Sequence, residues 1–290
     1  MPSVGSLHIV ESSEASARLR EAQRWLTART DRGALIVSAS RGAADDLARA
    51  VALSCGVAAG LHRFSFAQLA ARLAAPVLAA RGIAPATLIG SEAVAARAIF
   101  DARQDEDLTY FGAVAGTPGF PRALARTLHD LAMAGIESPA LRALPLGGPD
   151  LARLLQGFDE QFAAASATGR AALFTAACEG VGAVSRLPLL LLDVPLESAV
   201  EFELARQLIA SAPDTLITVP FGDLATLDYL ETLGTPVEVL EPSGDSDLAA
   251  LRRSLFAGRQ PPERQLHGDV RLVTQFPFRL GNGKDPILKK

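Results

Sequence analysis

The stretch ALIVSASRGAADDLAR, residues Ala34 to Arg49, decides the fold. It opens with four successive apolar residues, passes through a turn of small residues, and then reads as a helix from Ala43 to about Leu53. A continuous apolar run is typical of a strand that is covered on both faces, as in a parallel sheet. Because many α/β proteins hold a phosphate group at such a strand–helix turn, the stretch raises the question of whether this one does.

The same alternation of strand and helix occurs on both sides of a helical block. We expect helices between the strands, for example over 67–81 and 198–211. Such an order indicates a doubly wound parallel sheet. The predicted strands cover residues 6–10, 34–40, 61–66, 189–192, 215–223, 236–242 and 270–273.

Between residues 91 and about 180 the sequence is almost purely helical. Leu124, Leu128 and Leu131 recur at the spacing of one helix face. The predicted fold class is therefore α/β: a RecA-like parallel sheet with helices on both faces, interrupted by an all-α subdomain. We assign the sheet domain to residues 1–90 and 185–275, the helical insert to 91–184, and an atypical tail to 276–290.

The tail is assigned by composition. All lysines (Lys284, Lys289 and Lys290) and the only asparagine (Asn282) fall within its last residues, and every earlier basic side chain apart from histidine is arginine. We expect this tail to be foreign to the fold, as at a frame change or a truncation junction, and it carries no weight in the motif analysis.

Composition limits the function classes. The net charge is −4, from 28 basic and 32 acidic residues, so a polybasic nucleic-acid binder is excluded and any DNA contact must be local. Cys55 and Cys178 lie far apart without ligand spacing, so we expect two buried thiols and no metal site. No leader or membrane-spanning run is visible, which predicts a cytoplasmic protein without a membrane partner.

The turn at Gly42 lacks most of a phosphate loop. The pattern GxxxxGK[ST] uses glycines to bring backbone N–H groups to the phosphates, lysine for charge, and a hydroxyl for Mg²⁺. With Gly42 as its second glycine, Val37, Ala43 and Ala44 occupy the other three positions. Arg41 could meet a phosphate, but the acids of the adjacent Asp45–Asp46 pair repel one. We favour a structural turn over a working nucleotide site.

Two acids follow later strands. Asp193 ends the most apolar run of the chain, where an ATPase holds Mg²⁺, but Val194 stands where a second acid is expected. A role for Asp193 or Glu197 in capping or facing the next helix is the favoured alternative. Asp223 precedes another helix, and we favour an N-cap there over a role in sensing phosphate.

Taken in order, these features resemble a known family. The degenerate turn, FSFAQLAARL, the helical block with YFGAVAGTPGFPRALARTLHDLAMAGI, LLLLDVPLES and ITVPFGD resemble the N-terminal region of AddB. AddB is the inactivated helicase-like subunit of bacterial AddAB helicase–nucleases, in the PD-(D/E)XK nuclease family. The resemblance covers about residues 5–275. Ser65, Phe66 and Ala67 match the DNA-contacting TFHSFA-like motif, while Gly222 and Asp223 keep part of the VGD-like motif.

The resemblance implies a non-catalytic module that holds or scans DNA beside an AddA-type helicase–nuclease subunit, in double-strand break repair. Ser40, Arg41, Gly42, Asp193 and Asp223 would then form a vestigial nucleotide site, with no catalytic residue, metal or cofactor. This sequence departs from the family in lacking the second helicase-like domain, the nuclease and the cluster cysteines. We therefore expect no DNA cleavage by this chain alone.

The predicted DNA contacts are Arg63, Phe64 and Ser65, because a cation and an aromatic ring at a strand end can meet a phosphate and stack a base. Burial of Phe64 and solvation of Arg63 form the favoured alternative. The histidines show no spacing that indicates a hydrolase triad.

Two other functions remain open. One is a nucleotide-dependent enzyme with an atypical phosphate loop, which ATP and Mg²⁺ binding would reveal. The other is an α/β protein-interaction scaffold that never binds DNA, which salt-dependent DNA binding would exclude.

Overall fold

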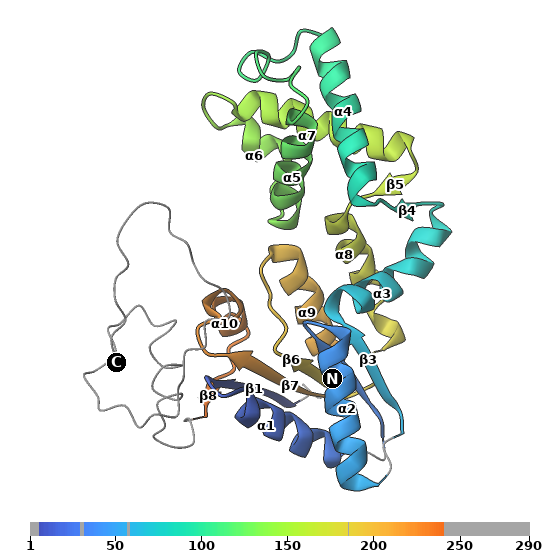
Figure 1. The fold of residues 1–290 in the computed structure, drawn as a ribbon, viewed down its shortest axis with the longest axis vertical. Helices are drawn as coiled ribbons and strands as arrows, with labels where there is room; N and C mark the ends of the chain where they lie inside the picture. Colours follow the sequence, from blue (N-terminus) through green and yellow to red (C-terminus); the bar gives the residue numbers. More distant parts are fainter. Residues whose placement is uncertain (1–5, 30–31, 57–58, 185, 241–290) are drawn as a thin grey trace, which may run out of the picture. The chain divides into compact units, whose positions relative to one another are not determined.

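A computed structural model describes residues 6–29, 32–56, 59–184 and 186–240. These residues belong to one compact unit, which extends to Glu241. Its centre is a six-stranded sheet in the order β3-β2-β6-β7-β1-β8, and every pairing is parallel (Figure 1). The strands are β1 (Ser6–Ser12), β2 (Ala34–Ser38), β3 (Leu61–Ser65), β6 (Leu189–Leu192), β7 (Asp214–Pro220) and β8 (Val237–Val239).

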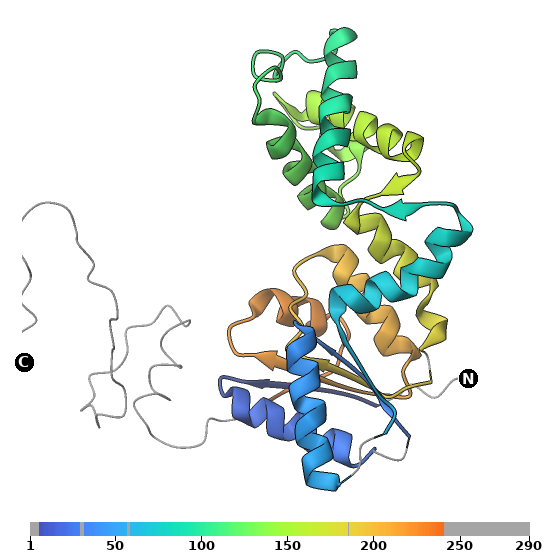
Figure 2. The same ribbon diagram turned by 45° about the vertical axis from the view of Figure 1, so that its right-hand side comes forward.

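Both faces of this sheet are covered by helices, because successive side chains of each buried strand point to opposite sides (Figure 2). In β6, Leu189 and Leu191 pack into one cluster, whereas Leu190 and Leu192 pack into the other. The first cluster is closed by α3 (Phe66–Ala80), α8 (Arg170–Glu179), α9 (Ala199–Ser211) and α10 (Leu224–Glu231). The second is closed by α1 (Ala15–Thr27) and α2 (Arg41–Cys55).

A third hydrophobic cluster belongs to the helical segment that follows α3. The short parallel pair of β4 (Ala84–Pro85) and β5 (Ala167–Thr168) closes the base of this segment. Its helices are α4 (Leu88–Gln104), α5 (Phe120–Met133), α6 (Ser138–Arg142) and α7 (Gly148–Ala164).

The α/β class with a parallel sheet, helices on both faces and an intervening helical segment is as predicted. The residues assigned to the insert, 91–184, divide between two cores, because Phe174 and Val181 pack into the first sheet cluster and not into the helical one. The expected strand over 270–273 and the tail over 276–290 lie outside the described residues.

Two expectations were wrong. The helix after β2 begins at Arg41, two residues before Ala43, so Asp45 lies beyond its first turn. The thiols are not both buried, since Cys55 is exposed at the end of α2 and Cys178 is only partly covered. No helix among the described residues is long and apolar enough to cross a bilayer.

Candidate functional site

The loops after β2, β6 and β7 meet at one edge of the sheet. The register places Ser38 beside Leu192, and Leu192 beside Thr218. Ligands of open α/β sheets bind outside this carboxyl edge. The topology therefore brings the turn with Ser40, the acid Asp193 and the loop after β7 to the same edge of the sheet.

The turn at the end of β2 is too short to wrap a phosphate. Only Ala39 and Ser40 separate β2 from α2, whereas a phosphate loop inserts a glycine-rich run between strand and helix. The Ser40 hydroxyl caps α2 by accepting a hydrogen bond from the Ala43 N–H at 3.3 Å. One of the N–H groups that would bind an anion is therefore already satisfied from within the chain.

Arg41, the first residue of α2, is held beside the edge strand. Its guanidinium lies 3.4 Å from the Asp45 carboxylate and 5.9 Å from the centre of the Phe64 ring. Gly42 follows without close contact to the rest of the chain, because a Cβ at this position would meet only the Ser40 hydroxyl, at 3.9 Å. No backbone approach at Gly42 requires a glycine.

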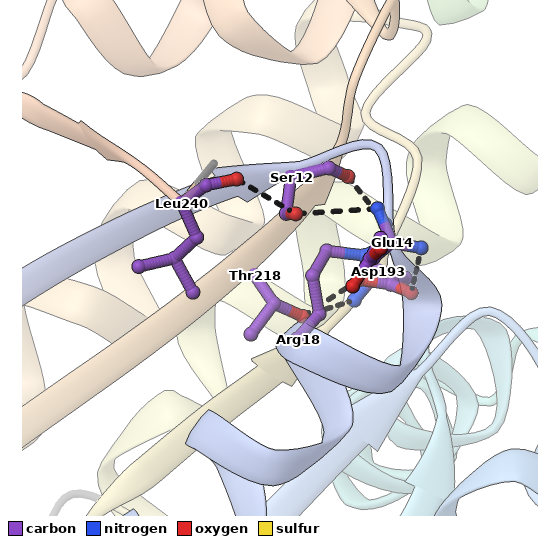
Figure 3. A network of polar contacts seen from close by, with 6 residues as sticks. All are labelled: Ser12, Glu14, Arg18, Asp193, Thr218 and Leu240. Atoms are coloured by element: carbon purple, nitrogen blue, oxygen red, sulfur yellow. Dashed lines mark hydrogen bonds and ion pairs between the residues drawn. The ribbon is translucent and has the colours of Figure 1, made fainter. Parts of the chain in front are cut away.

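Asp193 is bound by a cation from α1 (Figure 3). Arg18 donates from Nε to Oδ1 and from Nη2 to Oδ2 of Asp193, both at 2.9 Å. The Arg18 side chain is only 8% exposed, against 26% for Asp193. This two-pronged geometry is the strong form of an arginine–carboxylate pair.

The backbone around Asp193 fixes the direction of its carboxylate. Asp193 has φ of +48°, a left-handed conformation that aspartate adopts more readily than most residues. Its N–H donates to the Thr218 carbonyl at 3.0 Å, and the Thr218 hydroxyl donates to Oδ1 at 2.7 Å. The acid is thus tied to β7 as well as to α1.

Arg18 also connects this network to β1, which lies beyond β7 in the strand order. Arg18 Nη1 donates to the Ser12 carbonyl, at the end of β1. The Ser12 hydroxyl donates to the Leu240 carbonyl at 3.0 Å and accepts from the Glu14 N–H at 3.2 Å (Figure 3). This Arg18–Asp193 network links the ends of β1, β6 and β7 and the residue after β8.

Mg²⁺ needs oxygen ligands that are free to coordinate it. Here both oxygens of Asp193 accept hydrogen bonds from a tethered guanidinium, which neutralises the carboxylate without a metal. Within the described ranges, no group of three His, Cys, Asp or Glu side chains is placed to hold a metal ion. The arrangement is a structural ion-pair network at the position where a nucleotide-hydrolysing protein would coordinate Mg²⁺.

The favoured interpretation of Asp223 agrees with the structure. Its carboxylate accepts from the Thr226 N–H at 3.2 Å and caps α10. Neither Asp193 nor Glu197 caps the helix after β6, because the cap of α9 is Ser198, whose hydroxyl accepts from the Glu201 N–H.

The three predicted DNA contacts follow one another on β3, the edge strand. Arg63 and Phe64 point to opposite faces: Arg63 lines a groove with α2, and Phe64 packs against the cluster under α3. Arg63 lies 3.4 Å from Asp45. Ser65 caps α3, accepting from the Gln68 N–H while its own N–H donates to the Gln68 side chain.

The groove on the α2 side of β3 has a volume of about 650 Å³. It is lined by Asp45 and by Arg41, Arg49 and Arg63. The three arginine side chains are 46%, 68% and 41% exposed, in that order. We call it the arginine groove. Sequence reasoning named two of these arginines but missed Arg49, which lies two helical turns after Arg41 and so shares its face.

Sequence reasoning also missed Arg18, Ser12 and Thr218. For Arg18 a signal existed, because Arg18, Ala22 and Trp25 recur at i, i+4 and i+7 along α1, and all three are buried. A lone arginine within an apolar stripe indicates a buried partner. For Thr218 the sequence offers no such signal, since its role depends on the pairing of β7 with β6.

No family model matches the chain, and no curated protein matches it significantly.

Proposed function

We propose that this chain is a non-catalytic, helicase-like DNA-binding module that works beside an AddA-type helicase–nuclease subunit in the cytoplasmic repair of DNA double-strand breaks. The proposal combines the resemblance to AddB with two features of the structure. One is the Arg18–Asp193 network, in which both carboxylate oxygens of Asp193 accept hydrogen bonds from Arg18 instead of being free for Mg²⁺. The other is the arginine groove.

The arginine groove carries the DNA part of the proposal. Three exposed guanidinium groups line one concave surface on a chain whose net charge is −4. Asp45 lies near both Arg41 and Arg63 and holds their side chains toward the groove. Guanidinium groups pair well with phosphate oxygens, so the groove suits the backbone of a nucleic-acid strand.

Salt-dependent binding to single-stranded DNA tests this part. Each phosphate contact on a single strand contributes about 0.7 to the slope of log K against log salt concentration. We expect the unmodified chain to bind a labelled oligonucleotide, alone or with its partner subunit. The triple variant Arg41→Gln, Arg49→Gln, Arg63→Gln should lower this slope by about 2.

The matched control is Arg97→Gln, Arg142→Gln, Arg206→Gln, which removes the same charge from exposed sites outside the groove. Its slope should stay within about 0.5 of the unmodified value. Equal losses in the two triple variants would assign binding to net charge rather than to the groove. Binding to no DNA, even with the partner subunit, would instead favour a protein-interaction scaffold.

A nucleotide-dependent enzyme with an atypical phosphate loop is the second candidate. The exposed Arg41 at the start of α2 is the observation that favours it, because a cation there could meet a phosphate. This candidate requires ATP and Mg²⁺ to bind at the carboxyl edge of the sheet.

A further inference from the structure

A second concave surface lies in the helical segment, between α5 and α7. Its volume is about 860 Å³, and it opens beside the base formed by β4 and β5 and the start of α8. The floor is apolar, with Leu128, Leu155, Phe158 and Phe162 among its lining residues. We call it the helical groove. Its volume falls within the range of small-molecule sites, about 300–1,000 Å³.

Aromatic rings form part of the floor. Phe158 and Phe162 lie one turn apart on α7, and their rings meet edge to face with centroids 4.7 Å apart. Both are 7% exposed, so they are held in place by the surrounding core while still lining the groove. Such an arrangement offers ring edges and faces to a flat apolar molecule.

One wall of the helical groove is cationic. Arg122, Arg126 and His129 recur at i, i+4 and i+7 along α5, so they line one face of the helix. Arg122 forms an ion pair with Glu92, with 3.8 Å between Nε and Oε1. Within the described part of the chain, Arg126 and His129 have no hydrogen-bond or ion-pair partner.

The other charges of the groove do not cancel this wall. Arg170 is paired at 3.0 Å with Glu201, which is not among the lining residues. Asp159 is the remaining carboxylate, and burial together with the neighbouring Glu160 raises its pKa. Three arginines of the lining, Arg122, Arg126 and Arg170, thus face two carboxylates, Glu92 and Asp159. An anion therefore suits the groove better than a cation does.

We propose that the helical groove binds a small anionic aromatic molecule, with its ring system over Phe158 and Phe162 and its carboxylate or phosphate on Arg126. The proposal does not depend on DNA binding, because the helical groove and the arginine groove share no lining residue.

The test compares two probes that share a ring system and differ in charge: 2-naphthoate and 2-naphthylmethylammonium. Each is titrated into the full chain and followed by amide chemical shifts. We expect 2-naphthoate to bind with a Kd below about 1 mM, with shifts confined to α5, α7 and the start of α8. The ammonium probe should bind at least about tenfold more weakly.

Two variants make the test specific. Arg126→Gln removes the exposed cation and should weaken 2-naphthoate about fivefold to tenfold, the effect of one charge-assisted contact. Ala163→Trp, at an exposed lining position, should fill the groove and abolish binding. The control Arg97→Gln lies outside the groove and should bind normally. Failure of 2-naphthoate to bind, equal binding of both probes, or an unchanged Kd in Arg126→Gln would each overturn the proposal.

Discussion

Arg18 and Asp193 form an ion pair between residues 175 positions apart in the chain. The Arg18 side chain is nearly buried; its Nη1 also donates to the Ser12 carbonyl, and Asp193 also accepts from the Thr218 hydroxyl. A buried ion pair adds little stability relative to apolar residues of the same volume, but removal of one partner leaves the other uncompensated. Arg18 should therefore tolerate substitution poorly.

We predict that Arg18→Leu lowers the free energy of unfolding by about 2 to 4 kcal/mol, somewhat less than for a fully buried pair because Asp193 keeps some solvent contact. Urea unfolding measures the change. The control is Arg49→Leu, whose pair with Asp46 is exposed on both sides and should contribute less than about 1 kcal/mol. Equal stabilities of the two variants would contradict the role given to Arg18.

Glu203 gives a prediction on pH dependence. Its pKa is lowered from 4.5 to about 2, first by the hydrogen bond from Arg206 and then by that from Gln207. Because the folded pKa lies below the unfolded value, the interaction stabilises the fold above about pH 4.5, and this stabilisation is lost as the pH falls toward 2. The pair is exposed, so solvent screens much of this contribution.

Carboxyl carbon shifts should show Glu203 still ionised at pH 3.5 in the unmodified chain. In Arg206→Gln the pKa should rise toward 4.5, whereas Arg97→Gln should leave it unchanged. An ordinary Glu203 titration near pH 4.5 in the unmodified chain would show that the Arg206 contact does not hold in solution.

At the scale of the elements, the close contact between α3 and the end of α8 depends on a glycine. A Cβ at Gly180 would lie 2.3 Å from the Leu73 carbonyl oxygen and 3.0 Å from its carbon. The obstacle is backbone within a helix, which cannot move aside as a side chain would. Gly180 lets α8 close the core beneath Phe174.

Gly180→Ala should accordingly destabilise the chain by about 1 to 3 kcal/mol, the usual cost of overpacking. Gly182→Ala is a close control, because a Cβ there meets nothing within 4 Å. Thermal unfolding of the two variants measures the difference. A Gly180→Ala protein as stable as Gly182→Ala would mean that α3 and α8 lie further apart than described.

The strands β2 and β6 could be predicted because they contain continuous apolar runs, at residues 34–37 and 189–192. The start of α2 could not be predicted, because Ser40 and the small residues that follow it all suit the N-terminus of a helix. For the candidate site, Asp193 and Asp223 were located correctly at strand ends. The partner of Asp193 was not predicted, because its pairing with Arg18 depends on where α1 packs against the sheet.

At the scale of the whole molecule, the sheet has the alternating strands and helices of a nucleotide-binding protein. The groups at its carboxyl edge that would contact a nucleotide are engaged by other residues of the chain. Ser40 caps α2, whose N-terminus would face the phosphates. Arg18 forms an ion pair with Asp193, the acid that would bind Mg²⁺. Three exposed arginines lie in the arginine groove beside β3.

Calorimetric titration of ATP and Mg²⁺ into the purified chain tests most directly the claim that the carboxyl edge of the sheet binds no nucleotide. The Arg18–Asp193 network and the capped α2 predict no saturable binding in the micromolar range and no release of phosphate. One ATP bound per chain with a micromolar Kd, or steady phosphate release by the chain free of any partner motor, would contradict it.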